Sequence, residues 1–262
     1  RMRRLEFSKI EALPALKRFV IEKLRAHWNP DEIAGYLKRH RQQYPWYVSK
    51  TSLYEWLRTA RGERYCAFLY SKRKRIRRRK KKGAKRTIIP TRVALSARPA
   101  GATNRTRYGH CEVDTIVGRK GTHGGVKTCY ERKSRLVWAR KVRNMRPVHH
   151  TEVERIFTAQ ICCKSITRDN GIENKYHEML GVLSFFCDAY ASGQKGGVEH
   201  ANKMIRRYFP KGTDFRSIRQ SEIDRVVSII NKKPRRILGY RSALEVATKA
   251  GIIKNKSVLI LG

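Results

Sequence analysis

The stretch YGHCEVDTIVGRKG, residues 108–121, carries alternating and β-branched residues that predict a strand. Successive side chains of a strand point to opposite faces, so Glu112 and Asp114 share one face. Two carboxylates cannot lie in an apolar core without a large cost in free energy. We therefore expect that face to be solvated, paired with cations or bound to metal.

The segments that follow this strand predict a mixed sheet. The next two strand-like segments suggest an antiparallel meander with the first. The order of three strands, helix, strand, helix, strand, helix is that of an RNase H-like α/β domain. The predicted elements are strands at 124–135 and 136–143, a helix at 150–161, strands ending at Asp169 and near Asp188, and a helix from about Gly196.

The charge of the chain predicts a polyanionic partner. Its 262 residues include 61 Lys and Arg against 21 Asp and Glu, which gives a formal net charge of +40. Such a charge favours DNA or RNA, with binding that weakens steeply as salt rises. A ribosomal surface or an anionic membrane surface is the alternative, although the longest apolar runs are far too short to span a bilayer.

The cysteines and the N-terminus indicate a reducing compartment. The six cysteines show no zinc-finger spacing and fit buried free thiols, as in a reducing cytosol. The N-terminal residues give no support for a secretory signal.

The first seventy residues predict helices and a DNA-contacting face. In WNPDEIAGYLKRH, residues 28–40, Asn29 can cap a helix, and a second helix start follows at Ser49. Helix pairs of this kind are also common in proteins that never touch DNA, so it is the overall charge that favours a loose helix-turn-helix. The second helix would bury Leu53, Trp56 and Leu57 and present Lys50, Thr51, Tyr54 and Arg58 to DNA.

A basic run separates these helices from the strands. Residues 72–86 hold twelve Lys or Arg in fifteen positions. Because such dense like charges repel one another, we expect an extended arm that becomes ordered along a phosphate backbone or in a groove. A solvated linker or a localisation tag is the alternative. The arm residues assigned to DNA are Arg73, Arg75, Arg77, Arg78 and Arg79.

Further polar residues are expected near Asp114. Asp169 precedes the turn pair Asn170-Gly171, which leaves its carboxylate at the edge of the sheet. A polar row on the later helix makes poor packing and a good phosphate-binding surface. This row consists of Glu199, Asn202, Lys203 and Arg206.

Converging carboxylates indicate metal-dependent phosphoryl transfer. Two-metal catalysis needs several carboxylates around ions about 3.5 to 4 Å apart. Magnesium suits such a site because it takes oxygen ligands and keeps waters, and Mn²⁺ is a possible substitute. On composition alone, three surface acids in salt bridges with the excess of arginine would be the favoured interpretation.

Five segments together resemble the IS30-family transposases. They are GHCEVDTIVGRKG (109–121), YERKSRLVW (130–138), ITRDNGIE (166–173), GQKGGVEHANKMIRRYFPKGTDF (193–215) and INKKPRRILGYRSALEV (230–246). The resemblance covers roughly residues 28–250. It implies an RNase H-like DDE catalytic domain behind helix-turn-helix DNA binding, with Asp114, Asp169 and Glu199 as catalytic residues and metal ligands.

The resemblance also implies partners, supporting residues and boundaries. Glu112 and Asn202 would support the triad, with two Mg²⁺ ions per active site. The expected activity is DNA cleavage at terminal inverted repeats followed by strand transfer into target DNA, by a homodimer or larger assembly in the bacterial cytoplasm, associated with the nucleoid. The expected divisions are a helix-turn-helix domain at 1–70, a basic linker at 71–105, the catalytic domain at 106–235 and a C-terminal segment at 236–262. The family usually carries a further small helix-turn-helix ahead of this one, for which the chain leaves little room.

Two rival functions stay open from the sequence. One is a transposase-derived DNA-binding protein that has lost its chemistry. The other is an RNase H-like nuclease that hydrolyses DNA without joining it.

Overall fold

The chain folds into two compact units. The computed structural model describes residues 8–70, 89, 91–188, 191 and 193–254. One part, here called the helical unit, takes in Arg1–Lys80 and Lys233–Ser242, and the other, the sheet unit, takes in Lys81–Lys232 and Ala243–Gly262. The boundary drawn from the sequence between residues 235 and 236 thus falls inside a segment that groups with the helical unit.

Helices with well-formed caps build the helical unit. At α3 (Pro30–Arg39), the Asn29 side chain accepts the backbone N–H of Glu32 at 2.9 Å, and the Glu32 carboxylate accepts that of Asn29 at 2.8 Å. This capping box, and a Ser49 hydroxyl that accepts a backbone N–H at the start of α4 (Lys50–Trp56), confirm both predicted helix starts. The remaining elements are α1 (Lys9–Ala12), α2 (Pro14–Arg25) and the 3-10 helix η1 (Glu63–Phe68).

The predicted apolar face of α4 lies in the core of the helical unit. Leu53, Trp56 and Leu57 are buried there against residues of α2 and α3, including Leu24 and Ile33. The helix ends at Trp56, whose carbonyl accepts a bond of 2.7 Å from the Thr59 hydroxyl.

A segment from far along the chain completes the helical unit. The Lys233 ammonium lies 3.2 Å from the Glu32 carboxylate, and the Tyr240 hydroxyl donates to Asp31 at 3.3 Å. The Tyr240 ring lies so close to Gly35 that a Cβ there would stand 2.0 Å from a ring carbon. The segment contains β7 (Pro234–Arg235), η5 (Arg236–Leu238) and β8 (Arg241–Ser242).

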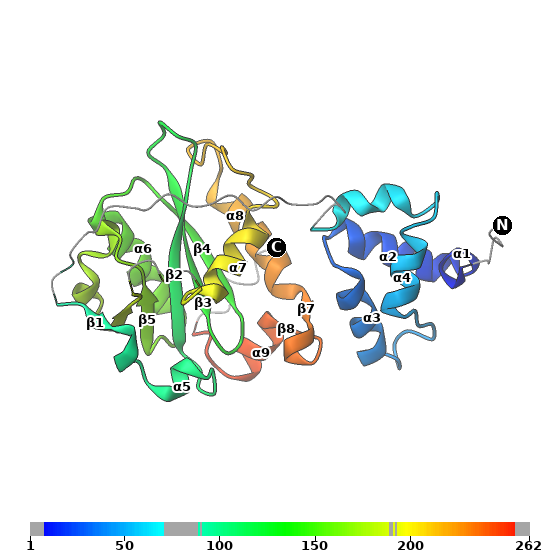
Figure 1. The fold of residues 1–262 in the computed structure, drawn as a ribbon, viewed down its shortest axis with the longest axis horizontal. Helices are drawn as coiled ribbons and strands as arrows, with labels where there is room; N and C mark the ends of the chain where they lie inside the picture. The colour runs from blue at the N-terminus through cyan, green and yellow to red at the C-terminus, as the bar shows by residue number, and fades with distance from the viewer. Residues whose placement is uncertain (1–7, 71–88, 90, 189–190, 192, 255–262) are drawn as a thin grey trace. The chain divides into compact units, whose positions relative to one another are not determined.

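The described part of the sheet unit contains one mixed sheet in the order β1-β6-β5-β2-β3-β4 (Figure 1). Strands β2, β3 and β4 form the predicted antiparallel meander, whereas β2, β5, β6 and β1 run parallel to one another. This topology confirms the RNase H-like α/β fold. The bounds are β1 (Val93–Ala94), β2 (His110–Val117), β3 (Gly125–Glu131), β4 (Val137–Val142), β5 (Ser165–Arg168) and β6 (Leu183–Phe186).

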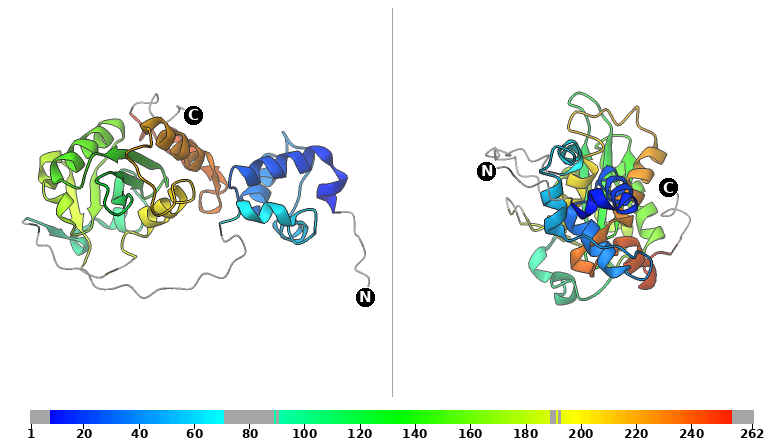
Figure 2. Two further views of the ribbon diagram at one scale, coloured as in Figure 1. Left: turned by 90° about the horizontal axis from the view of Figure 1, so that it is seen from above. Right: turned by 90° about the vertical axis from the view of Figure 1, so that its right-hand side faces the viewer.

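Helices cover both faces of this sheet (Figures 1 and 2). On one face, Ile116 of β2 packs with α7 (Gly196–Ile205) and α8 (Gln220–Lys232). On the other, Cys111 and Val113 pack with α6 (Pro147–Gln160) and α9 (Ala243–Lys249). Because side chains alternate along β2, Glu112 and Asp114 lie on the face that α7 covers.

The segment between β5 and β6 differs from the expected helix. It forms two short 3-10 helices, η3 (Ile172–Asn174) and η4 (His177–Leu180). Tyr176 leaves helical geometry between the two turns, and Gly181 ends the second with a φ of 62°. The predicted α-helix at this place is therefore wrong, and η3 instead brings its residues close to the end of β5.

The cysteines behave as small apolar side chains. All six are free, and Cys66, Cys111, Cys129 and Cys187 are buried. No helix in the described part of the chain is long and apolar enough to cross a membrane.

Candidate active site and DNA-contact surface

Glu112 is buried and holds α7 against β2. It forms an ion pair with Arg132, whose guanidinium also donates to the backbone of α5 (Ala100–Thr103). Its second oxygen accepts a hydrogen bond of 2.9 Å from the backbone N–H of Val198, in the first turn of α7. A carboxylate at this position complements the positive end of the helix dipole. Glu112 thus fixes the helix that carries Glu199 to the strand that carries Asp114.

Asp114 contacts α7 through a side-chain hydrogen bond. Its Oδ2 accepts a bond of 2.7 Å from Asn202 Nδ2, and the Oδ1 of Asn202 accepts one of 2.7 Å from the Thr128 hydroxyl. Thr128 is the cross-strand neighbour of Asp114 on β3. The predicted supporting residue Asn202 therefore contacts Asp114 directly.

Asp169 lies beside Asp114 because their strands are parallel neighbours. The register of β2 and β5 pairs Glu112 with Thr167, so two further residues along each strand bring the two aspartates together. The Oδ1 of Asp169 accepts bonds from the Gly171 backbone at 3.4 Å and from Asn174 Nδ2 at 2.9 Å.

The Lys195 ammonium lies between the two aspartates. Its Nζ is 3.2 Å from Asp114 Oδ1 and 3.0 Å from Asp169 Oδ2, and it also donates to the Val113 carbonyl at 3.2 Å. The three acceptors define a single cation position. Lys195 itself is buried, whereas the Asp114 and Asp169 side chains are 26% and 44% exposed, so this position is reachable from solvent.

Mutual attraction keeps Asp169 and Lys195 charged. Burial raises the pKa of Asp169, but attraction to Lys195 and the hydrogen bond between them outweigh it, so the pKa lies below its ordinary value. Burial lowers the pKa of Lys195, but attraction to Asp114 and Asp169 outweighs it, so that pKa lies above its ordinary value. The arrangement is thus one ammonium held by two carboxylates.

Glu199 lies one turn into α7 and is half-buried. Its backbone N–H donates to the Lys195 carbonyl at 3.1 Å, so the two residues lie one helical turn apart. Among the residues described, no group of three or more His, Cys, Asp or Glu side chains is arranged to hold a metal ion. The structure therefore brings Asp114 and Asp169 together around Lys195 and does not bring Glu199 into such a group.

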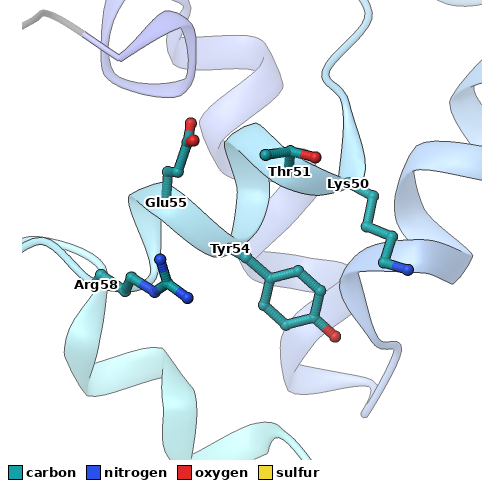
Figure 3. A pocket seen from close by; sticks show the side chains of 5 residues that line it. All are labelled: Lys50, Thr51, Tyr54, Glu55 and Arg58. Carbon is teal, nitrogen blue, oxygen red and sulfur yellow. The ribbon is translucent and has the colours of Figure 1, made fainter.

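The exposed face of α4 lines an open hollow of about 410 Å³ on the helical unit (Figure 3). The four residues assigned to DNA from the sequence line it together with Glu55: they are Lys50, Thr51, Tyr54 and Arg58. Two cations, a hydroxyl and an aromatic ring on one open face can contact phosphates and base edges.

The other cations assigned to DNA have varied surroundings. Lys203 is exposed on α7, whereas Arg206 donates to the carbonyls of Val117 at 2.6 Å and Pro210 at 3.2 Å and so contacts the protein itself. The arm residues lie outside the described residues; they are Arg73, Arg75, Arg77, Arg78 and Arg79.

Sequence reasoning missed Lys195, Asn174 and Arg132. Lys195 is one of 61 basic residues and has no local signal that separates it from the rest. Asn174 follows Asp169 by five residues, at a place where a regular helix was expected. Arg132 lies in the turn that follows β3, beside other cations. Because a buried carboxylate needs a cationic partner, the sequence could have predicted a cation near Glu112, but it could not have identified Arg132.

Comparisons with known proteins find transposases of insertion sequences among the relatives of this chain. No family model matches the chain. It is 32% identical over 235 residues to the transposase for insertion sequence element IS4351 of Bacteroides fragilis, covering 87% of this chain and 71% of that protein. It is 30% identical over 249 residues to the transposase InsI for IS30C of Escherichia coli (strain K12), covering 88% and 64%. Among solved structures, the catalytic core domain of BIV integrase aligns with a TM-score of 0.44 at 15% identity, covering 55% of this chain and 95% of that one. On its identity to these transposases over most of its length, the chain belongs to the IS30 family of insertion-sequence transposases.

Proposed function

We propose that the chain is a DDE transposase that binds the terminal inverted repeats of its element, cleaves DNA at their ends and transfers the freed strands to target DNA. The cation position between Asp114 and Asp169 supports this most directly, because side chains from two strands converge on one charge. In a chain with a net charge of +40, such a pair forms a local negative site that can hold a cation near a phosphate.

The residues at this position fit a divalent ion. Carboxylate oxygens are the ligands that Mg²⁺ prefers, and both side chains are partly exposed. Mg²⁺ binds oxygen at about 2.0 to 2.1 Å, so it and the ammonium cannot share the position. We propose that Asp114, Asp169 and Glu199 hold two Mg²⁺ ions, with Mn²⁺ as a substitute. When bound, such ions stabilise charge on the attacking and leaving oxygens of an in-line displacement at phosphorus.

The remaining side chains orient these ligands. Asn202 holds one oxygen of Asp114 and is itself held by Thr128, so the carboxylate presents its other oxygen to the cation position. Glu112 fixes the start of α7 and with it the backbone of Glu199. We infer that withdrawal of Lys195 opens the position to the ion and lets Glu199 complete the ligand set.

The helical unit supplies DNA recognition in this proposal. The α4 face lines an open hollow with side chains suited to phosphates and bases. Lys203 and the basic arm add contacts that carry no sequence information. Because two ends must be joined in one event, we propose a homodimer or larger assembly on DNA.

A plasmid assay tests the chemistry. Supercoiled plasmid with the cognate ends is incubated with Mg²⁺ and the wild-type protein, D114N, D169N, E199Q or the control E222Q, which changes an exposed acid at the start of α8. We expect wild type and E222Q to nick at the element ends and the other three to lose nicking while retaining DNA binding in a mobility-shift assay. Nicking that survives all three substitutions contradicts the triad.

The same assay separates the rival functions. A wild-type protein that binds the ends but never nicks them in Mg²⁺ or Mn²⁺ is a DNA-binding protein without chemistry. Nicked product that never joins to a labelled target duplex indicates a nuclease.

A further inference from the structure

Asn174 links Asp169 to a buried lysine. It is the last residue of η3, is buried, and donates from Nδ2 to Asp169 Oδ1 at 2.9 Å and to the Asp169 carbonyl at 3.2 Å. Its Oδ1 accepts a bond of 3.3 Å from the Lys127 ammonium and one of 3.5 Å from Arg168 Nη1. One amide side chain thus spans the gap between a carboxylate at the proposed active site and a cation in the core.

The chemistry of these partners fixes the orientation of the amide. A lysine ammonium can only donate and an ionised carboxylate can only accept, so the oxygen of Asn174 must face Lys127 and its nitrogen must face Asp169. A flipped amide would set oxygen against carboxylate and nitrogen against ammonium. The side-chain amide of Asn174 therefore has one favourable orientation, in which its nitrogen donates to Asp169 Oδ1.

The cation behind Asn174 belongs to a buried group of charges. Glu154 of α6 lies 2.9 Å from Lys127 and 2.5 Å from Arg168, and all three side chains are at most 3% exposed. Two cations and one anion leave a net positive charge in the core. Buried ion pairs are often no better for stability than apolar residues of similar size. Stability alone is therefore a weak reason for this group to exist.

The two oxygens of Asp169 have different roles. Oδ2 faces the cation position, where Lys195 lies at 3.0 Å, whereas Oδ1 faces Asn174. If an ion replaces Lys195, Oδ2 loses its present partner, but Oδ1 keeps its own. The hydrogen bond from Asn174 is thus suited to hold the carboxylate in place through that exchange.

We propose that Asn174, backed by the buried Lys127, is a positioning residue that fixes the Asp169 carboxylate for divalent-ion binding. The proposal rests on the proposed function in that it takes Asp169 as a metal ligand. Partners that orient a ligand in this way commonly contribute about 10- to 100-fold to metal affinity.

The test is Mn²⁺ binding to the full chain without DNA. It is measured by titration calorimetry and by the electron paramagnetic resonance signal of free Mn²⁺. In N174L an apolar group of similar size replaces the amide, so we expect the dissociation constant to rise by about tenfold or more. In N174D the new carboxylate can still accept from Lys127, but it repels Asp169 because both are negatively charged. We therefore expect N174D, too, to bind Mn²⁺ more weakly than wild type at pH 8. A merely electrostatic role would instead make N174D bind more tightly than wild type, and that result would overturn the proposal.

A matched control separates positioning from loss of stability. Ser184 accepts a bond of 3.2 Å from Arg168 Nε and has no bond of its own to Asn174 or Asp169 among those described; Arg168 reaches Asn174 through a different nitrogen, at 3.5 Å. We expect S184A to lower the melting temperature in EDTA about as much as N174L while leaving the Mn²⁺ affinity within about twofold of wild type. Equal losses of affinity in S184A and N174L contradict a specific role for Asn174.

D114N distinguishes failure of this proposal from failure of the proposed function. If D114N retains full Mn²⁺ affinity, the site itself is not a metal site. If D114N abolishes binding and N174L leaves it unchanged, the metal site stands and the role of Asn174 does not.

Discussion

The backbone N–H of Val198 donates a 2.9 Å hydrogen bond to the Glu112 carboxylate, which joins the first turn of α7 to β2. The same carboxylate neutralises Arg132. One buried acid therefore positions both a strand and a helix of the candidate site. Its neighbour on the same face, Asp114, turns one oxygen to Asn202 and the other to the cation position.

Replacement of Glu112 should destabilise the protein strongly. In E112Q the amide oxygen can still accept from Val198, but Arg132 becomes an unpaired buried charge, so we expect a loss of about 3–5 kcal/mol in the free energy of unfolding. Urea denaturation measures this. The double variant E112L/R132M, which removes both charges, should be more stable than E112L alone. If E112Q unfolds at the same urea concentration as wild type, the ion pair has no stabilising role.

Removal of Lys195 should strengthen divalent-ion binding. The ammonium and the ion would occupy the same position between Asp114 and Asp169, so K195M removes a competitor. We expect the Mn²⁺ dissociation constant to fall by about tenfold, which corresponds to ~1.4 kcal/mol. K203M, on the exposed side of α7, is the control and should bind Mn²⁺ as wild type does. Weaker binding by K195M would show that the lysine organises the carboxylates and is not displaced.

A methyl group at Gly197 should disturb the site. A Cβ there would lie 2.3 Å from a ring carbon of the buried Tyr130 and 2.8 Å from an oxygen of Glu112, so α7 must move. We expect G197A to cost about 1–3 kcal/mol of stability and to reduce nicking. The adjacent Gly196 provides a matched control, since its Cβ would meet nothing within 4 Å. Thermal melts of G196A and G197A that coincide would contradict close packing of the helix on the sheet.

The α4 face should contribute to DNA affinity. Arg58 lines the open hollow, so R58A should weaken binding to the terminal repeats and lower the slope of log affinity against log salt by about 1 if the contact is to a phosphate. Fluorescence anisotropy over a salt series measures both. K38A, which removes an exposed cation from α3 away from the hollow, should change the affinity less. An equal effect of the two variants would assign the binding to overall charge.

Stability should fall on acidification through His150. Burial, with a smaller effect of nearby Lys127, lowers the pKa of this histidine from 6.5 to about 4, against a weaker opposing effect of Glu154. Because the folded pKa is the lower one, the contribution to stability is complete above pH 6.5 and is lost as pH falls from 6.5 towards 4. H150L should therefore flatten the melting temperature against pH in that window. A melting curve for H150L that keeps the wild-type slope between pH 4 and 6.5 would contradict this assignment.

The features predicted correctly from the sequence depend on near neighbours in the chain. The cap at Asn29 needs only Glu32, and the shared face of Glu112 and Asp114 needs only the alternation of a strand. The alternation also indicated that this face must be charged or wet, which both residues bear out.

The features that were missed depend on contacts between distant residues. Lys195 contacts Asp114 from 81 positions away and Asp169 from 26, and no pattern in the sequence marks it for either. The helix expected after Asp169 failed for a related reason. Residues of this segment bond to the end of β5, where Asn174 and Gly171 donate to Asp169.

The return of residues 233–242 to the helical unit bears on how such proteins can be recombined. Tyr240 fills the space that Gly35 leaves, and Lys233 pairs with Glu32, so the helical unit is not one uninterrupted segment of the chain. A chimera that exchanges only the amino-terminal helices between relatives would separate them from the segment equivalent to residues 233–242, against which they pack. A successful exchange of the helical unit should therefore carry both pieces together, and natural shuffling of these enzymes should face the same constraint.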